Sequence, residues 1–229
     1  MARPIRVLHC GDAECYARAP FSLDASYLYG CSMSQTVLIA GASGLVGHAA
    51  MEAFAAEGGW SVIGVSRRQP PPVAGTTVHS IDLLDAAACD QLFSAMPQVT
   101  HVVYAALQEE PGLMPGWLDP AVMQRNAAML RNLFEPLRRV ATGLQHVTLL
   151  HGTKAYGLHH PSVGVSGVHI PLREREPRRE HPNFYFLQED YLRELQASAG
   201  WGVTVFRPTV IYGDAPGNNM NPTLVIAAY

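Results

Sequence analysis

Short apolar runs alternate with longer amphipathic segments through most of the chain. A short continuous apolar run is typical of a strand buried on both faces, whereas a longer segment with a period near 3.6 residues indicates a helix. The pattern predicts strands over residues 36–40, 61–65, 77–81, 101–106, 144–150 and 203–206. It predicts helices over residues 45–57, 85–96, 120–140 and 188–198. This alternation indicates an α/β fold with a doubly wound parallel sheet, the Rossmann arrangement.

The first 33 residues lack such a period and differ from the rest of the chain. They mix proline, arginine, cysteine and aromatic residues, and Asp12 and Glu14 argue against a transit peptide. Met33 lies just ahead of the first predicted strand. We therefore expect residues 1–33 to be a disordered or wrongly assigned extension, and residues 34–229 to form the nucleotide-binding domain.

The composition narrows the class of protein, because 48% of the residues are hydrophobic and 15% are charged, as in soluble globular domains. A net charge of −3 provides no basic field for nucleic acid or an anionic membrane. No apolar run approaches the roughly 18 residues that span a bilayer. We therefore expect a cytoplasmic protein without nucleic-acid or membrane partners. The cysteines lack the spacing of metal ligands, so we expect free thiols and no metal site at Cys10, Cys15, Cys31 and Cys89.

A glycine-rich loop follows the first predicted strand and opens the first predicted helix. Glycines in such a loop allow a tight turn, let the backbone approach a pyrophosphate, and let the helix pack closely on the strand. The loop therefore predicts a dinucleotide site formed by Gly41, Ser43, Gly44, Leu45, Val46 and Gly47. The strand–turn–helix context favours this interpretation over a glycine turn without a ligand.

The residues after the second predicted strand discriminate between the two nicotinamide cofactors. NAD-binding folds usually place an acidic residue there for the ribose 2′-hydroxyl, whereas this chain has Ser66, Arg67 and Arg68. Two guanidinium groups and a hydroxyl suit a 2′-phosphate, because arginine forms paired hydrogen bonds with phosphate. We therefore expect NADP(H) rather than NAD, with Asp82 and Leu83 where the adenine amino group is usually held.

Lys154 is the only lysine among the 16 basic residues, and all the others are arginine. The pKa of a lysine responds to its surroundings, whereas an arginine stays charged, so reaction centres use lysine. Lys154 follows a predicted strand, where α/β folds place their chemistry. The alternative is a surface lysine that arose by chance in an arginine-rich sequence, and composition by itself does not separate the two.

Most short-chain dehydrogenases carry a Tyr-x-x-x-Lys motif, and no tyrosine of this chain has a lysine four residues later. Lys154 instead lies in Gly152-Thr153-Lys154-Ala155-Tyr156, ahead of Asn183-Phe184-Tyr185-Phe186-Leu187-Gln188-Glu189-Asp190. These segments resemble the progesterone 5β-reductase/iridoid synthase-like family, an atypical branch of the extended short-chain dehydrogenases/reductases in which the lysine precedes the tyrosine. Further similar segments are residues 66–68, 125–132 and 207–213.

The resemblance implies catalytic roles for Lys154 and Tyr185. Phe186 occupies the alternative tyrosine position and has no proton to give. The resemblance also implies that the cofactor contacts Tyr185, Ala105, Ala106, Pro208, Val210, Asn219 and Met220. Family members continue well beyond residue 229, so we expect a C-terminally truncated chain whose substrate domain is largely missing.

The implied reaction is hydride transfer from NADPH to the β-carbon of an enone or enal, with Tyr185 stabilising the enolate oxygen. A nearby Lys154 ammonium is expected to lower the pKa of the tyrosine. The same pair could serve ketone reduction, and an epimerase or carbonyl reductase and a catalytically silent NADP-binding sensor remain alternatives. The expected partner is a small molecule with an α,β-unsaturated carbonyl, and a homodimer is left open.

Overall fold

The computed structural model describes residues 35–110, 114–163, 168–215 and 221–227. The predicted extension, residues 1–33, lies outside the described residues, and so do Cys10, Cys15, Cys31, Asn219 and Met220.

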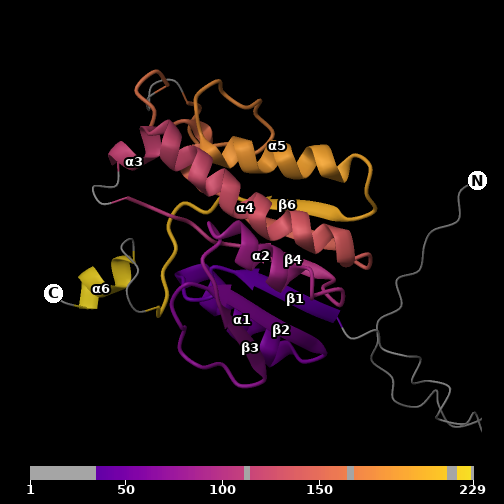
Figure 1. Cartoon of the computed structure of the whole chain (residues 1–229). Coiled ribbons are helices and arrows are strands. Elements are labelled where there is room, and N and C mark those ends of the chain that lie inside the picture. The colour runs from indigo at the N-terminus through magenta and orange to yellow at the C-terminus, as the bar shows by residue number, and fades with distance from the viewer. Residues whose placement is uncertain (1–34, 111–113, 164–167, 216–220, 228–229) are drawn as a thin grey trace, which may run out of the picture. The chain divides into compact units, whose positions relative to one another are not determined.

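Six strands and their helices alternate along the described chain (Figure 1). The strands are β1 (Gln35–Ala40), β2 (Trp60–Ser66), β3 (Thr76–Ser80), β4 (His101–Tyr104), β5 (His146–Leu150) and β6 (Gly202–Phe206). The helices are α1 (Leu45–Glu57), α2 (Ala86–Phe93), α3 (Met114–Leu118), α4 (Pro120–Val140), α5 (Phe184–Gln196) and α6 (Pro222–Ala227), with a 3-10 turn, η2 (Thr153–Tyr156). The predicted α/β class is confirmed.

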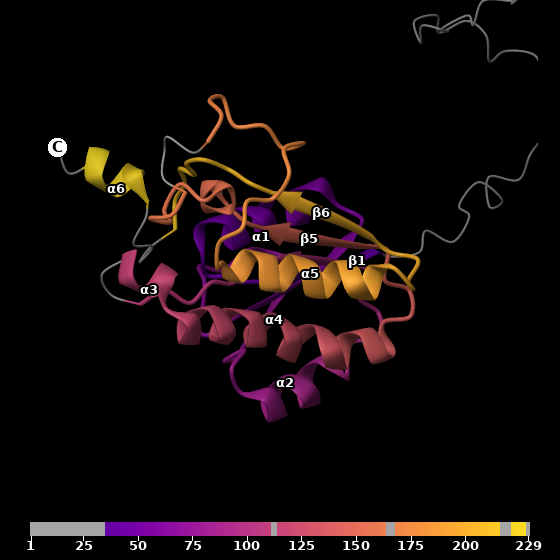
Figure 2. The same cartoon turned by 90° about the horizontal axis from the view of Figure 1, so that it is seen from above.

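All six strands are parallel, in the order β3-β2-β1-β4-β5-β6. The direction of travel across the sheet reverses between β1 and β4. Because β-α-β crossovers are right-handed, the reversal places α1 on one face and α2, α4 and α5 on the other. Figure 2 shows α2, α4 and α5 on one side of the sheet and α1 on the opposite side. In such a fold, ligands bind at the carboxyl ends of the strands near the reversal.

Alternation along each strand divides the core between the two faces of the sheet. Leu38 and Ala40 of β1 belong to the larger cluster, which the helices α2, α4 and α5 cover. Val37 and Ile39 belong to a second cluster, which includes Met51 of α1. Successive strand residues point to opposite faces, so a continuous apolar run is what a sheet covered on both faces requires.

Several elements differ from the predicted pattern, and three of the differences bear on the site. The fourth strand ends at Tyr104 rather than at residue 106. The stretch 107–119, for which the pattern predicts neither a strand nor a helix, contains α3. Helix α5 begins at Phe184, four positions before the predicted start at Gln188, because Asn183 caps it by accepting a hydrogen bond from the Tyr185 backbone N–H at 3.0 Å. The early start places Tyr185 in the first turn of a helix.

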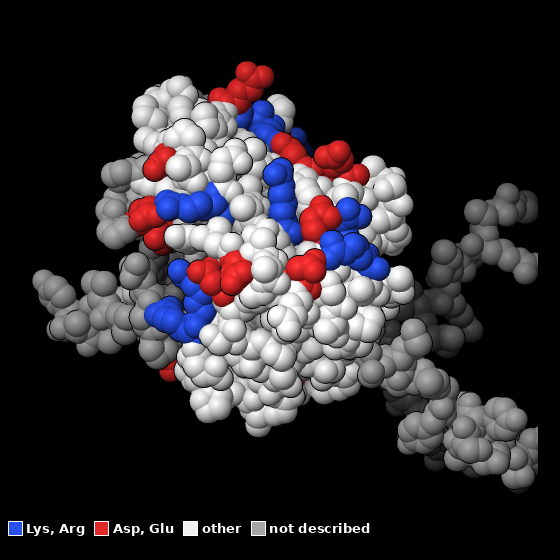
Figure 3. Space-filling model, viewed as in Figure 1, with Lys and Arg blue, Asp and Glu red and all other residues white. Residues whose placement is uncertain are grey.

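Figure 3 shows basic and acidic side chains interspersed over the face formed by α2, α4 and α5. Ion pairs account for part of this pattern, including Arg138 with Glu135 and Arg139 with Asp90. Among the described residues, no helix is both long enough and apolar enough to span a membrane. Within the same ranges, no cluster of three or more His, Cys, Asp or Glu side chains is arranged to hold a metal ion.

Candidate active site

A cavity of about 830 Å³ lies where the carboxyl ends of the six strands meet. Each strand contributes the residues that follow it, from Gly41 after β1 to Pro208 after β6. The volume is in the range of cofactor and ligand pockets in proteins. The topology therefore collects at one edge residues that lie far apart in the sequence.

The glycine loop closes one side of this cavity. Gly41 has a φ of +86°, and a Cβ atom there would lie 2.7 Å from the Ala105 carbonyl oxygen, so the position requires glycine. Gly44 caps α1 without a side-chain hydrogen bond, and no acidic residue lies in the first turn of the helix. The N-terminus of α1 thus presents backbone N–H groups to the cavity, an arrangement that fits a pyrophosphate.

Gly47 lines no part of the cavity but packs beneath the loop. A Cβ atom at Gly47 would lie 2.1 Å from the Gly41 carbonyl oxygen. We expect Gly47→Ala to lower the free energy of unfolding by about 1–3 kcal/mol, because backbone atoms must move to accommodate the methyl group. Denaturant unfolding measures this loss. Gly143→Ala is the matched control, since a Cβ atom there has no neighbour within 4 Å, and an equal loss in both variants would contradict the close approach.

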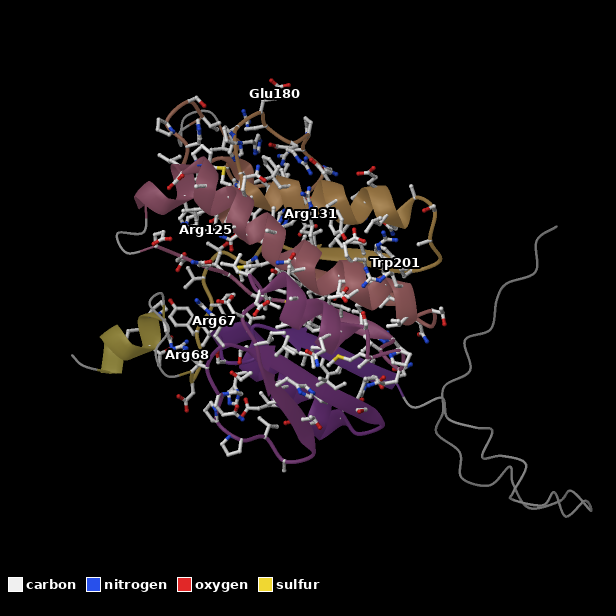
Figure 4. The ribbon with its side chains drawn as sticks, in the orientation of Figure 1. Arg67, Arg68, Arg125, Arg131, Glu180 and Trp201 are labelled. Carbon is white, nitrogen blue, oxygen red and sulfur yellow. The ribbon has the colours of Figure 1, made fainter. Side chains whose placement is uncertain are left out.

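The predicted 2′-phosphate site also lies on the cavity wall, where Ser66, Arg67 and Arg68 follow β2. Arg67 and Arg68 are exposed at the end of β2, where Figure 4 shows them side by side. Hydrogen bonds hold their backbone, because the Ser66 hydroxyl donates to the Arg68 carbonyl at 2.6 Å and the Ser80 hydroxyl donates to the Arg67 carbonyl at 3.0 Å. Asp82 and Leu83 line the same cavity.

Lys154 lies in η2, directly after β5, and its side chain lines the cavity. Its backbone carbonyl accepts hydrogen bonds from the Gly157 N–H at 3.1 Å and from the Asn183 side-chain amide at 3.0 Å. The His181 Nε2 lies 3.3 Å from the same carbonyl oxygen. Burial lowers the pKa of Lys154, and the nearby Glu109 carboxylate opposes this effect. The backbone of the lysine is therefore fixed at a position from which the residue lines the cavity.

Tyr185 lies in the first turn of α5 and is buried, with its side chain on the cavity wall. Its hydroxyl lies over Gly152, since a Cβ atom at that glycine would be 3.3 Å from the hydroxyl oxygen. Burial raises the pKa of Tyr185, and Glu109 raises it further. The net shift of this pKa is upward, opposite to the lowering expected from a nearby Lys154 ammonium, because loss of solvent dominates. Tyr185 is accordingly a neutral hydrogen-bond donor.

Asn183 connects the two predicted catalytic segments. Its amide nitrogen donates to the Lys154 carbonyl, and its amide oxygen accepts the Tyr185 backbone N–H. One buried side chain thus holds residues that are 31 positions apart in a defined relation. The geometry explains why the tyrosine can follow the lysine from a different helix.

Glu109 and Trp117 are functional candidates that sequence reasoning did not single out. Both line the cavity beside Lys154 and Tyr185. Asn126 holds the start of their loop, since its side chain exchanges two hydrogen bonds of 2.9 Å with the backbone of Gln108. The position of a tryptophan after the fourth strand was the only hint in the sequence that this stretch could belong to the site. Nothing local indicated that the tryptophan lies beside the catalytic pair.

His151 lies behind Tyr185 and is a further residue that the sequence did not reveal. The two rings stack, with centroids 4.3 Å apart and planes 13° apart. Burial lowers the pKa of His151 to about 3, with help from the positive charges of Arg207 and Arg178. Glu189 balances those charges, because its carboxylate lies 3.7 Å from Arg207 and 3.4 Å from Arg178. His151 is therefore a neutral aromatic support for the tyrosine ring.

The cavity wall includes most of the residues predicted to contact the cofactor. Those on it are Gly41, Ser43, Gly44, Leu45, Val46, Ser66, Arg67, Arg68, Asp82, Leu83, Ala105, Ala106, Tyr185, Pro208 and Val210. Gly47 packs beneath the loop, and Asn219 and Met220 lie outside the described residues. The residues present fit a dinucleotide.

Comparison with known proteins agrees with this geometry. Residues 37–229 match the NAD dependent epimerase/dehydratase family. The chain belongs to that family. Members are nicotinamide-dependent, in agreement with the glycine loop and with the start of α1, which has no side-chain cap hydrogen bond. The similarity includes most of the described domain and both predicted catalytic positions.

Two relatives within the family agree with the resemblance inferred from the displaced Lys/Tyr pattern. (S)-8-oxocitronellyl enol synthase CYC2 of Camptotheca acuminata is 32% identical over 203 residues, which are 84% of this chain and 50% of that protein. 3-oxo-Delta(4,5)-steroid 5-beta-reductase of Arabidopsis thaliana is 31% identical over 211 residues, or 86% and 52%. The chain thus spans about half the length of the curated relatives it matches.

Two solved structures share the fold. UDP-glucose 4-epimerase of Thermotoga maritima superimposes with a TM-score of 0.65 at 18% identity, over 83% of this chain and 61% of that one. The Bordetella bronchiseptica enzyme WbmH, solved with NAD+, gives a TM-score of 0.59 at 17% identity, over 81% and 59%. At these identities the likeness supports the Rossmann architecture alone.

Proposed function

We propose that this chain is the catalytic cofactor-binding part of an NADPH-dependent reductase that acts on the activated C=C bond of an enone or enal. The observation that carries the proposal is the convergence of Lys154 and Tyr185 on one cavity with the glycine loop. Two relatives are an enol synthase and a steroid 5-beta-reductase, and both names support this class of reaction. The family alternative is an epimerase or carbonyl reductase.

Bound NADPH would supply the hydride. The protein's own residues stabilise the negative charge that then develops on the carbonyl oxygen. Tyr185 remains protonated because burial raises its pKa, so its hydroxyl can donate a hydrogen bond to that oxygen. The Lys154 ammonium adds positive charge at the same end of the cavity. The Tyr185 hydroxyl and the Lys154 ammonium can therefore stabilise the enolate oxygen in their protonated forms.

The choice of NADP(H) over NAD(H) belongs to the same proposal. Arg67 and Arg68 follow β2 and line the cavity, while no acidic residue occupies the turn between β2 and residue 70. A 2′-phosphate would pair with the guanidinium groups, whereas the free 2′-hydroxyl of NAD would lack the usual carboxylate partner.

NADPH oxidation in the presence of a small enone tests the function, with analysis of the product by mass spectrometry and NMR. We expect a saturated carbonyl product, with the C=C bond reduced and the C=O bond intact. An allylic alcohol product would instead support carbonyl reduction. Because the chain spans half the length of its relatives, the same assay on a chimera that carries the C-terminal part of such a relative provides the comparison.

One result would overturn the enzyme proposal, and another would overturn the role given to Lys154. Both forms could bind NADPH yet leave the enone unchanged, which would support a silent cofactor-binding protein. A fully active Lys154→Arg variant would remove the proposed role of the lysine, because arginine retains the charge but not the compact, adjustable ammonium.

A further inference from the structure

Trp117 lies between the two charged side chains at the catalytic end of the cavity. The Lys154 ammonium nitrogen sits 3.6 Å from the centre of the indole ring. The indole N–H donates to the Glu109 carboxylate at 3.3 Å. The face of the ring therefore binds the cation and its edge binds the anion. This matches the charge distribution of the indole, whose face is partly negative and whose edge is partly positive.

Lys154 and Glu109 nevertheless do not pair directly. Within the described residues, the Lys154 ammonium has no carboxylate partner within 4.0 Å, although Glu109 lines the same cavity and is the charge that acts on its pKa. Opposite charges in a partly buried site attract more strongly as they approach. Some group must therefore hold them apart, and the indole contacts both.

We propose that Trp117 is a positioning residue that separates Lys154 from Glu109, so that the ammonium stays available to the substrate carbonyl. This inference rests on the proposed function for its purpose, although the separation itself is a property of the protein alone. Without the indole, Lys154 and Glu109 are expected to form an ion pair. The paired ammonium would then offer less positive charge to the enolate oxygen.

The packing around Trp117 suits a fixed spacer. The side chain is 4% exposed, and its ring contacts Phe184 with centroids 4.8 Å apart and Tyr185 with centroids 5.3 Å apart. His159 approaches from a third side at 5.7 Å. The indole thus touches both predicted catalytic side chains, and its position follows that of α5.

The single lysine allows a direct test. Reductive methylation with ¹³C-formaldehyde labels only Lys154 and the N-terminal amine, and Lys154→Arg assigns the two NMR signals. We would titrate the labelled lysine in the wild type, Glu109→Gln, Trp117→Leu and the double variant. The other titratable groups near the lysine, Tyr185, His159 and His181, are unchanged in all four forms.

We expect Glu109→Gln to lower the pKa of Lys154 by about 1 or more in the Trp117→Leu background, because an ion pair within reach has that effect. The decrease should be smaller in the wild-type background, where the indole keeps the charges apart. A decrease that is equal in both backgrounds, or larger in the wild type, would overturn the proposal. The comparison is a double-mutant cycle, so any direct effect of Trp117→Leu on the lysine pKa cancels, because both forms compared in that background carry the substitution.

Two further measurements keep the test decisive. If thermal unfolding shows that Trp117→Leu does not fold, Trp117→Phe replaces it, because phenylalanine retains an aromatic face and lacks the N–H. Glu109→Gln should again lower the pKa of Lys154 more in that background than in the wild type. In the enone assay, Trp117→Leu should lose turnover and the double variant should recover part of it. Inactivity of every form would count against the proposed function, while the pKa comparison would still decide the role of Trp117.

Discussion

Replacing Tyr185 by phenylalanine is expected to reduce turnover of an enone by about 100- to 1000-fold, the range found when one donor to a developing oxyanion is removed. The substitution deletes the hydroxyl that lies over Gly152 and leaves the ring stacked on His151. NADPH affinity should change little, because the adenosine end of the cavity is untouched. Turnover rates and cofactor titrations measured on the same preparation check both parts.

Tyr191→Phe is the matched control for this prediction. Tyr191 lies on the same helix, and its hydroxyl donates to Glu135 at 2.8 Å, away from the cavity. The same chemical change should leave turnover near the wild-type value there. Comparable losses in the two variants would show that the effect comes from the helix, and the role of the Tyr185 hydroxyl would have to be abandoned.

Replacing Arg67 and Arg68 together by alanine is expected to weaken NADPH binding by about 100-fold or more, since a hydrogen bond to a charged group contributes about 1.5–3 kcal/mol. NADH binding should change only slightly, because the free 2′-hydroxyl carries no charge. The variant should therefore lose most of its cofactor preference. Fluorescence titration with each cofactor measures the ratio.

Arg175→Ala controls for the loss of positive charge in general, because Arg175 is exposed and does not line the cavity. It should leave both affinities unchanged. If the double variant lost affinity for NADH and NADPH equally, the arginines would serve binding of the shared part of the cofactor, and the preference for NADP(H) would be wrong.

The sequence predicted the cofactor end of the site better than the catalytic end. Gly41, Gly44 and Gly47 belong to one short segment of the chain, so the pattern that they form can be recognised from local sequence. Lys154 was visible for a different reason, since it is the only lysine. Trp117 and Glu109 carry no such local signal, because their role depends on the position of α5 and η2.

Helix α5 shows why boundaries matter to the site. The apolar period predicted a start at Gln188, which would have left Tyr185 in a loop. The observed start at Phe184 follows from the Asn183 cap, and the same amide holds the Lys154 carbonyl. A capping residue followed by aromatic side chains lacks a clear period, so pattern alone missed the first turn.

By itself, the sequence determined the order of strands and helices, the dinucleotide loop, the pair of arginines after β2 and the displaced Lys/Tyr pattern, because each depends on residues close together in the chain. Only the tertiary structure decided which side chains surround that pair. The parallel sheet brings the ends of β4 and β5 together, and α5 packs beside them. Trp117, Glu109 and His151 thereby meet Lys154 and Tyr185, since contacts between distant segments depend on packing rather than on local sequence.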